Sequence, residues 1–167
     1  MNTQSTTQHS VENDLRGVLI SVAGGRLLLP NASMAEIISF SDPELVANAP
    51  AWLLGRLRWR GWRVPVIAFS RLAGLAEERG QLGSKVVVIK ALGGNQRLSF
   101  FAVLTQGFPR LINVARDRLA VNGGDNPLPL GVKARVVLND DAALIPDLTM
   151  IELLIDEALH PAEAPAT

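Results

Sequence analysis

The chain has 167 residues, of which 48% are hydrophobic and 19% are charged, and its 16 basic residues balance its 16 acidic ones. This composition is typical of a globular protein with a packed core and excludes a disordered chain. A net charge of zero argues against electrostatic steering toward nucleic acid or an acidic membrane, and the lack of cysteine excludes disulfides and thiolate chemistry.

The two ends of the chain are polar or rich in proline and alanine. Residues 1–14 contain no apolar stretch of the kind that a secretory signal needs, and we expect them to form a flexible arm. Residues 160–167 are expected to form a flexible tail. Because the apolar runs are too short to cross a bilayer, we expect a cytoplasmic protein without direct membrane insertion.

The first half of the chain predicts short strands separated by glycine turns. Asn31–Ser33 favours a short helical turn, and so does the proline that opens residues 50–54. Pro65 lacks an amide donor for a β-ladder, so its strand is expected at a sheet edge or at a bulge. The expected strands cover residues 17–22, 26–29, 55–60 and 62–69.

The second half continues in the same way after a polar joint at residues 76–84. Its expected strands cover residues 85–92, 97–104, 108–114, 131–138 and 142–146. Thr149–Leu159 is the one expected helix, capped by Asp147 or Thr149, and Met150, Leu153, Leu154 and Ala158 form its expected apolar face. The residues alone therefore predict an all-β protein with one terminal helix.

Catalytic chemistry is poorly represented in the sequence. The only histidines, His9 and His160, lie in or beside the predicted arm and tail, and there is no tyrosine. No glycine-rich phosphate loop opens a helix, and Asp140-Asp141 is more simply a turn than a metal site. We expect no enzyme activity, no cofactor and no metal site.

One segment, residues 51–71, concentrates residue types that dominate binding surfaces. It holds all three tryptophans and five arginines, with no acidic residue between Glu44 and Glu77. Strand alternation predicts one face with Arg56, Arg58 and Arg60, and the opposite face with Leu57 and Trp59 toward a core. Trp62 is expected to be an exposed aromatic anchor; the other interpretation is that it covers the end of the fold.

Two further functions use the same residues. Interleaved arginine and tryptophan on a hairpin also suit a single-stranded nucleic-acid-binding β-barrel protein, which is the alternative function. The zero net charge and the lack of a second basic cluster argue against it, so nucleic acid is not an expected partner. Arg56 and Arg60 form the RxxxR of cyclic-dinucleotide-binding PilZ proteins, but the segment that follows it in those proteins is missing.

Three segments together resemble the CheW-like family of chemosensory adaptor proteins. They read MAEII at residues 34–38, GRLRWRGWRVPVIAF at 55–69 and LIPDL at 144–148, so the resemblance spans roughly residues 15–158. The chain departs from the family pattern at Arg58-Trp59, where Asn-Leu is usual, and at Ala68-Phe69, where Asp-Leu is usual. These departures suggest a retained scaffold with one rewritten contact surface.

The resemblance implies both a fold and a function. The implied fold is all-β, with two packed five-stranded SH3-like β-barrels, one over residues 15–80 and one over residues 81–159, the latter including a C-terminal α-helix. The implied function is that of a non-catalytic adaptor. It would couple the cytoplasmic tip of a chemoreceptor to a CheA-type histidine kinase in chemotaxis or twitching motility.

The same resemblance implies a receptor- or kinase-binding site. Its expected residues are Met34, Glu36, Gly55, Arg56, Arg58, Arg60, Trp62 and Arg63. Glu36 and Arg60 are predicted to form a charge-assisted pair. The changes at Arg58 and Ala68 are predicted to lie at an interface rim, where they would alter partner choice rather than stability.

Overall fold

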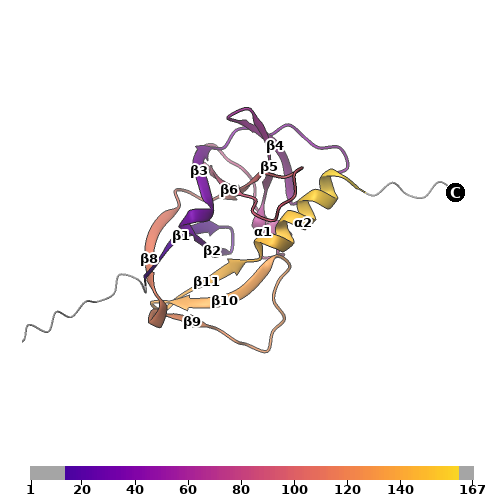
Figure 1. Ribbon diagram of the computed structural model, residues 1–167. Coiled ribbons are helices and arrows are strands. Elements are labelled where there is room, and N and C mark those ends of the chain that lie inside the picture. Colours follow the sequence, from indigo (N-terminus) through magenta and orange to yellow (C-terminus); the bar gives the residue numbers. More distant parts are fainter. Residues whose placement is uncertain (1–13, 162–167) are drawn as a thin grey trace, which may run out of the picture.

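The computed structural model describes residues 14–161, so the predicted arm at 1–14, with His9, and the tail at 160–167 lie almost entirely outside the described residues. Within that range the chain is built mainly from short strands (Figure 1). The strands are β1 (Asp14–Val22), β2 (Gly25–Pro30), β3 (Met34–Ser39), β4 (Leu53–Trp59), β5 (Trp62–Ile67), β6 (Lys85–Lys90), β7 (Phe100–Thr105), β8 (Arg110–Ala115), β9 (Leu119–Val121), β10 (Val132–Leu138) and β11 (Asp141–Pro146). The helical elements are η2 (Asn31–Ser33), α1 (Phe69–Leu72), η3 (Arg116–Arg118) and α2 (Leu148–Leu159).

The strands form two sheets, which confirms the predicted fold class. One sheet has six strands in the order β8-β1-β2-β11-β10-β9, and the other has five in the order β3-β6-β7-β5-β4. The first sheet exceeds the expected five strands because the short β9 pairs with β10.

The division of the strands between the sheets corrects the expected boundary near residue 80. The five-stranded sheet is the continuous middle of the chain, β3 to β7, whereas the six-stranded sheet joins β1 and β2 to β8–β11. The bonds that join the chain ends are the antiparallel pairing of β1 with β8 and a parallel contact of β2 with β11. Local turn signals predict hairpins, but they carry no information on these distant pairings.

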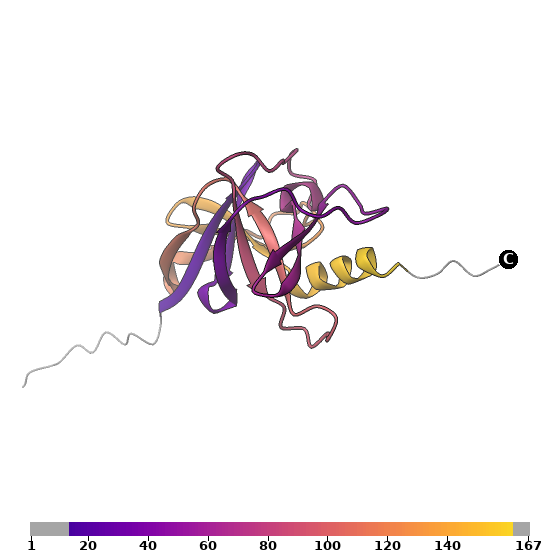
Figure 2. The ribbon, with the colours of Figure 1, turned by 90° about the horizontal axis from the view of Figure 1, so that it is seen from above.

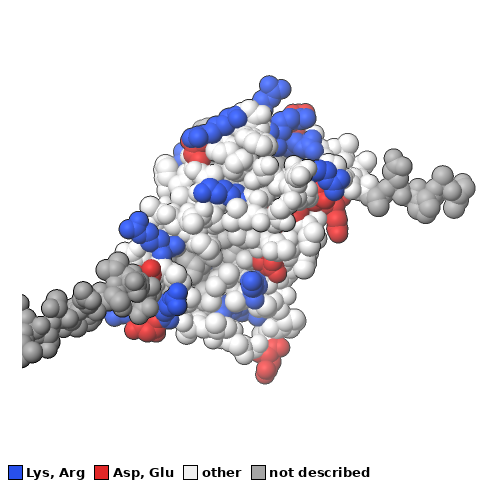
Figure 3. Space-filling model, in the orientation of Figure 1, with Lys and Arg blue, Asp and Glu red and all other residues white. Residues whose placement is uncertain are grey.

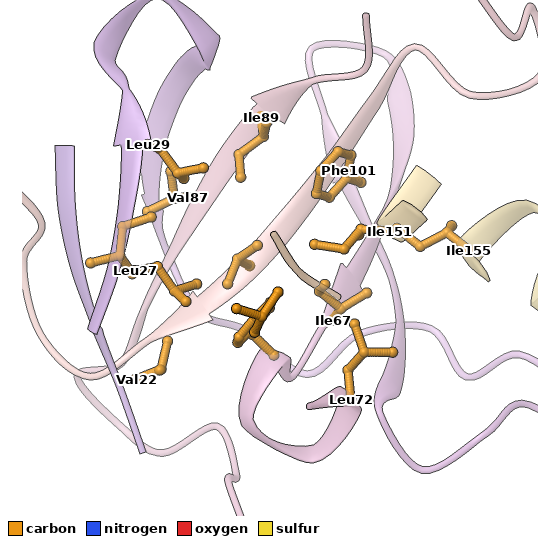
Figure 4. Close-up of a cluster of buried hydrophobic side chains, with 14 of the residues drawn as sticks. Val22, Leu27, Leu29, Ile67, Leu72, Val87, Ile89, Phe101, Ile151 and Ile155 are labelled. Carbon is orange, nitrogen blue, oxygen red and sulfur yellow. The ribbon is translucent and has the colours of Figure 1, made fainter. Parts of the chain in front are cut away.

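Alternation along the strands produces three apolar clusters. Leu19 and Leu28 belong to a cluster of the six-stranded sheet, and Val64 and Val66 belong to a cluster of the five-stranded sheet. The largest cluster lies between the sheets and takes residues from both of them and from both α-helices (Figure 4). Its buried members include Ile20, Leu27, Ile67, Phe69, Val87, Phe101, Ile151 and Ile155.

Helix α2 begins with a side-chain cap and closes the core between the sheets. The Asp147 carboxylate accepts the Met150 N–H at 3.0 Å, as the sequence predicted. The buried face carries Ile151 and Ile155, whereas Met150 and Leu153 of the expected apolar face are exposed. The helix has apolar residues on more than one side, and packing selects the side with the two isoleucines. No helix in residues 14–161 is long and apolar enough to span a bilayer.

Pro65 lies in an internal strand, which corrects the expectation of a sheet edge. β5 is flanked by β4 and β7, but its pairing with β7 involves Val66 and Ile67, just after the proline. The expected irregularity occurs instead on the neighbouring strand, where the β4 register shifts between Leu53 and Gly55. The proline is tolerated because the ladder to β7 does not use its position.

Candidate functional site

The β4–β5 hairpin carries most of the expected contact residues. Its two-residue turn consists of Arg60 and Gly61, both with positive φ, at 47° and 79°. This turn sets the register so that Trp59 faces Trp62 and Arg58 faces Arg63 across the two strands. The hairpin therefore presents one aromatic pair and one basic pair.

Glu36 connects the two edges of the five-stranded sheet. Its Oε2 accepts the Trp59 Nε1–H and lies 3.3 Å from Arg60 Nε. The Arg60 guanidinium also lies 5.2 Å from the centre of the Trp59 ring. Because β3 and β4 are the opposite edges of the sheet, this contact shows that the sheet curls until its edges meet.

The predicted pairing of Glu36 with Arg60 is thus confirmed, but the pair is accessible to solvent. The Arg60 side chain is 69% exposed and the Glu36 side chain is 37% exposed. Ion pairs of this kind contribute little to stability. The carboxylate and guanidinium remain available to a binding partner.

Arg60 does not share a face with Arg56 and Arg58, contrary to the alternation argument. Its guanidinium lies over Trp59, on the side of Glu36, because the turn interrupts the alternation of the strand. Arg58, by contrast, is exposed opposite Arg63. Leu57 points into the core as predicted, and Trp59 is half-buried.

Phe100 on β7 holds the two tryptophans of the hairpin. Its ring centre lies 4.9 Å from that of Trp59 and 5.3 Å from that of Trp62, and both contacts are edge-to-face. Trp62 is nevertheless 48% exposed. It therefore contacts the fold on one side and presents an apolar surface on the other.

Glu44 orders the outer side of the hairpin. Its backbone forms an isolated bridge with Arg56, and its Oε1 lies 2.5 Å from the Arg63 guanidinium. The bridge depends on Gly55, which has a φ of 140°, because a Cβ there would lie 2.4 Å from the Glu44 carbonyl oxygen. Gly55 thus permits a close backbone approach beside the arginines.

Met34 and Ala68, both expected at the contact surface, pack toward the interior of the fold. Met34 begins β3 and packs, half-buried, against the cluster between the sheets. Ala68 is fully buried, and its N–H donates to the Trp52 carbonyl at 2.8 Å. The expectation that Ala68 lies at an exposed rim is therefore wrong, because β5 continues directly into the buried α1.

Sequence reasoning missed Phe100 and Glu44 as members of the site. Phe100 lies in a strand 38 residues after Trp62 and carries no local signal of its own. Glu44 follows Asp42-Pro43, a pair that predicts the end of a helix or strand and gives no sign of a contact residue. Figure 3 shows the basic side chains of this region gathered at one end of the molecule, above the β4–β5 hairpin.

Two of the comparisons with known proteins found a match. The model of the CheW-like domain family matches residues 16–152. The crystal structure of the scaffolding protein TtCheW from Thermoanaerobacter tengcongensis superposes with a TM-score of 0.67 at 15% sequence identity, over 80% of this chain and 88% of that chain. None of the curated proteins matches the sequence. The family match covers most of the chain and the structural likeness shows the same fold; the chain is a member of the CheW-like domain family.

Proposed function

We propose that this protein is a non-catalytic adaptor that couples a chemoreceptor-type signalling protein to a CheA-type histidine kinase. The observation that carries the proposal is the CheW-like match over residues 16–152. The pathway would be a chemosensory one that controls chemotaxis or twitching motility. The adaptor would act in the cytoplasm, where the receptor tip and the kinase meet.

The proposed contact surface comprises the β4–β5 hairpin and the adjoining β3. Its residues are Met34, Glu36, Gly55, Arg56, Arg58, Arg60, Trp62 and Arg63. Support comes from the exposure of Arg58 and Trp62 and from the accessible Glu36–Arg60 pair. Exposed tryptophan and arginine side by side combine an apolar face with directional donors, as binding hot spots do.

Co-purification tests this function directly. A tagged full-length chain is expressed in its native cells, and the proteins that co-elute are identified by mass spectrometry. We expect a CheA-type kinase and a chemoreceptor to be enriched over a tag-only sample. Glu36→Arg places two like charges together at Arg60 and is expected to reduce the recovery of at least one partner.

Asp117→Arg is the control, because Asp117 is an exposed acidic residue in η3, beside the six-stranded sheet. It is expected to leave recovery unchanged. Purified kinase is then assayed with receptor and adaptor, and an adaptor is expected to change the rate of kinase autophosphorylation only when receptor is present. Enrichment of neither a kinase nor a receptor overturns the proposed function.

A further inference from the structure

A pocket with basic walls lies between the β4–β5 strands and the C-terminal end of α2. We call it the basic notch, and its volume is about 220 Å³. Figure 2 shows α2 beside the five-stranded sheet. The residues that line the notch include Arg56, Trp62, Arg63, Arg97, Phe100, Leu159 and His160.

Two of the arginines in the notch are held in place by carboxylates of this chain. Arg63 pairs with Glu44 at 2.5 Å, and Arg97 pairs with Asp156 at 2.6 Å. Arg56, the third arginine of the notch, forms no ion pair with any residue in 14–161. The notch therefore contains an ordered set of donors with an excess of positive charge.

The neighbouring strand register adds to this excess. Arg58 and Arg63 are direct cross-strand partners, and like charges directly opposite one another destabilise a pair of strands. Within the described part of the chain, Arg58 also lacks an ion-pair partner. Glu44 pairs only with Arg63. A carboxylate from another molecule would neutralise Arg58 and form charge-assisted hydrogen bonds with its guanidinium group.

We propose that the basic notch binds an acidic segment of a partner protein. Carboxylates of that segment pair with Arg56 and Arg63 in the notch and with Arg58, which lies beside it as the cross-strand partner of Arg63. An apolar side chain of the segment packs on the exposed face of Trp62. The proposal rests on the proposed function, because it names the chemistry of a protein partner at the same surface.

The surroundings of the notch favour an acidic protein segment over nucleic acid. Glu44 and Asp156 pair with two of the arginines that line it, and Figure 3 shows acidic side chains beside the basic ones on the α2 side. A continuous phosphate backbone needs a positive track that extends over several nucleotides, and here it would meet these carboxylates. Single glutamate or aspartate side chains reach the arginines one at a time.

The three tryptophans of the chain make the proposal testable by NMR. The full-length ¹⁵N-labelled protein is titrated with an acetylated hexaglutamate peptide and, separately, with hexaserine. We expect hexaglutamate to shift the Trp62 indole signal and to leave that of Trp52 in place, and hexaserine to shift neither. Raising the salt from about 50 mM to about 200 mM is expected to weaken the binding, because exposed charges are screened.

The variant Arg56→Gln/Arg63→Gln is expected to bind hexaglutamate at least about fivefold more weakly, as loss of rim charge pairs predicts. Arg116→Gln/Arg118→Gln is the matched control, since both residues are exposed in η3, beside the other sheet. A dispersed spectrum and an unchanged melting temperature verify that each variant is folded.

Three results overturn the proposal: no shift at Trp62, an equal shift with hexaserine, or an equal loss of affinity in the control variant. Tighter binding of a single-stranded oligonucleotide than of hexaglutamate does so as well, and makes the surface a nucleic-acid site. The proposed function fails separately. Absence of kinase and receptor from the co-purification overturns the function alone, whereas equal recovery of both with wild type and Arg56→Gln/Arg63→Gln overturns the acidic-segment proposal alone.

Discussion

Glu78 and Glu36 are two carboxylates held in opposite ways. Glu78 is 2% exposed, and its Oε2 accepts the Ala23 N–H at 2.7 Å and the Gln106 side-chain amide at 3.1 Å. Glu36 has a 37% exposed side chain and contacts Trp59 and Arg60. The buried carboxylate accepts hydrogen bonds from neutral donors, whereas the exposed one has a charged partner and is accessible to solvent. The first location is therefore structural, and the second is suited to binding.

Near Glu78, side-chain hydrogen bonds connect the two sheets. The turn between β1 and β2 belongs to the six-stranded sheet, and its Ala23 carbonyl accepts the Ser70 hydroxyl of α1 at 2.5 Å. Thr105, at the end of β7, donates to the Ser21 carbonyl at 3.1 Å. We call this region the junction. Because each contact joins one sheet to elements of the other, the junction sets how the sheets are placed.

The largest expected loss of stability comes from a substitution next to the buried α1, and an exposed substitution on the β4–β5 hairpin is expected to have little effect. Ala68→Asp buries a carboxylate without a partner and is expected to lower the free energy of unfolding by about 3 kcal/mol or more. Arg58→Asn, at an exposed site of the hairpin, is expected to change it by less than about 0.5 kcal/mol. Urea denaturation of both variants measures the difference, and similar effects would show that burial does not distinguish these positions.

Within the junction, Glu78→Ala removes a buried acceptor that serves two donors, the Ala23 N–H and the Gln106 side-chain amide. We expect a loss of about 2 kcal/mol, because the part-buried Ala23 N–H loses its acceptor, whereas the amide of the exposed Gln106 can bond to water instead. Glu77→Ala is the matched control at an exposed neighbour and is expected to cost less than about 0.5 kcal/mol. Calorimetry measures both, and hydrogen exchange at Ala23 is expected to quicken only in Glu78→Ala. Unchanged exchange there would contradict a structural role for this carboxylate.

Asp156, with a side chain 18% exposed, lies between the two extremes. Burial by itself would raise its pKa, but the hydrogen bond from Asn95 and the charge of Arg97 outweigh burial, so the pKa is lowered from its ordinary value. A depressed folded-state pKa stabilises the protein above the unfolded-state value, and this contribution disappears as the pH falls through the folded-state value.

Asp156→Asn is therefore expected to cost about 1 kcal/mol or less at neutral pH and to flatten the acid limb of the stability curve. Thermal unfolding from neutral pH down into the acid range tests this. If stability falls equally steeply with acid in the variant, the pH dependence of stability arises from groups other than Asp156.

The smallest expected effect is at Glu36 and Arg60. A double-mutant cycle with Glu36→Gln and Arg60→Gln is expected to give a coupling energy of about 0.5 kcal/mol, because both side chains are solvent-accessible. In the co-purification, each variant is expected to recover clearly less partner protein, although its free energy of unfolding is almost unchanged. A coupling energy above about 2 kcal/mol is typical of a buried ion pair and would contradict the solvent accessibility of this one.

Local features of the fold were predictable from the sequence. The turn at Gly61, the cap at Asp147 and the inward direction of Leu57 all depend on residues close together in the chain. The turn expected at Gly24-Gly25 lies one residue earlier, at Ala23-Gly24. The Glu36–Arg60 pair was also predicted, but through the resemblance to a family, since no spacing rule joins β3 to the end of β4. Local conformational preference and binary pattern were sufficient for these features.

Tertiary structure alone decided which strands share a sheet, which face of α2 is buried, that Pro65 lies in an internal strand and that Ala68 is buried. It also brought Phe100 to the two tryptophans, and Arg97 to the basic notch. Each of these depends on a partner far along the chain. The hydrophobic pattern predicts that a face is buried, but it does not predict which element packs against that face. Many strand pairings bury a similar apolar area, and only the complete packing of the fold selects one of them.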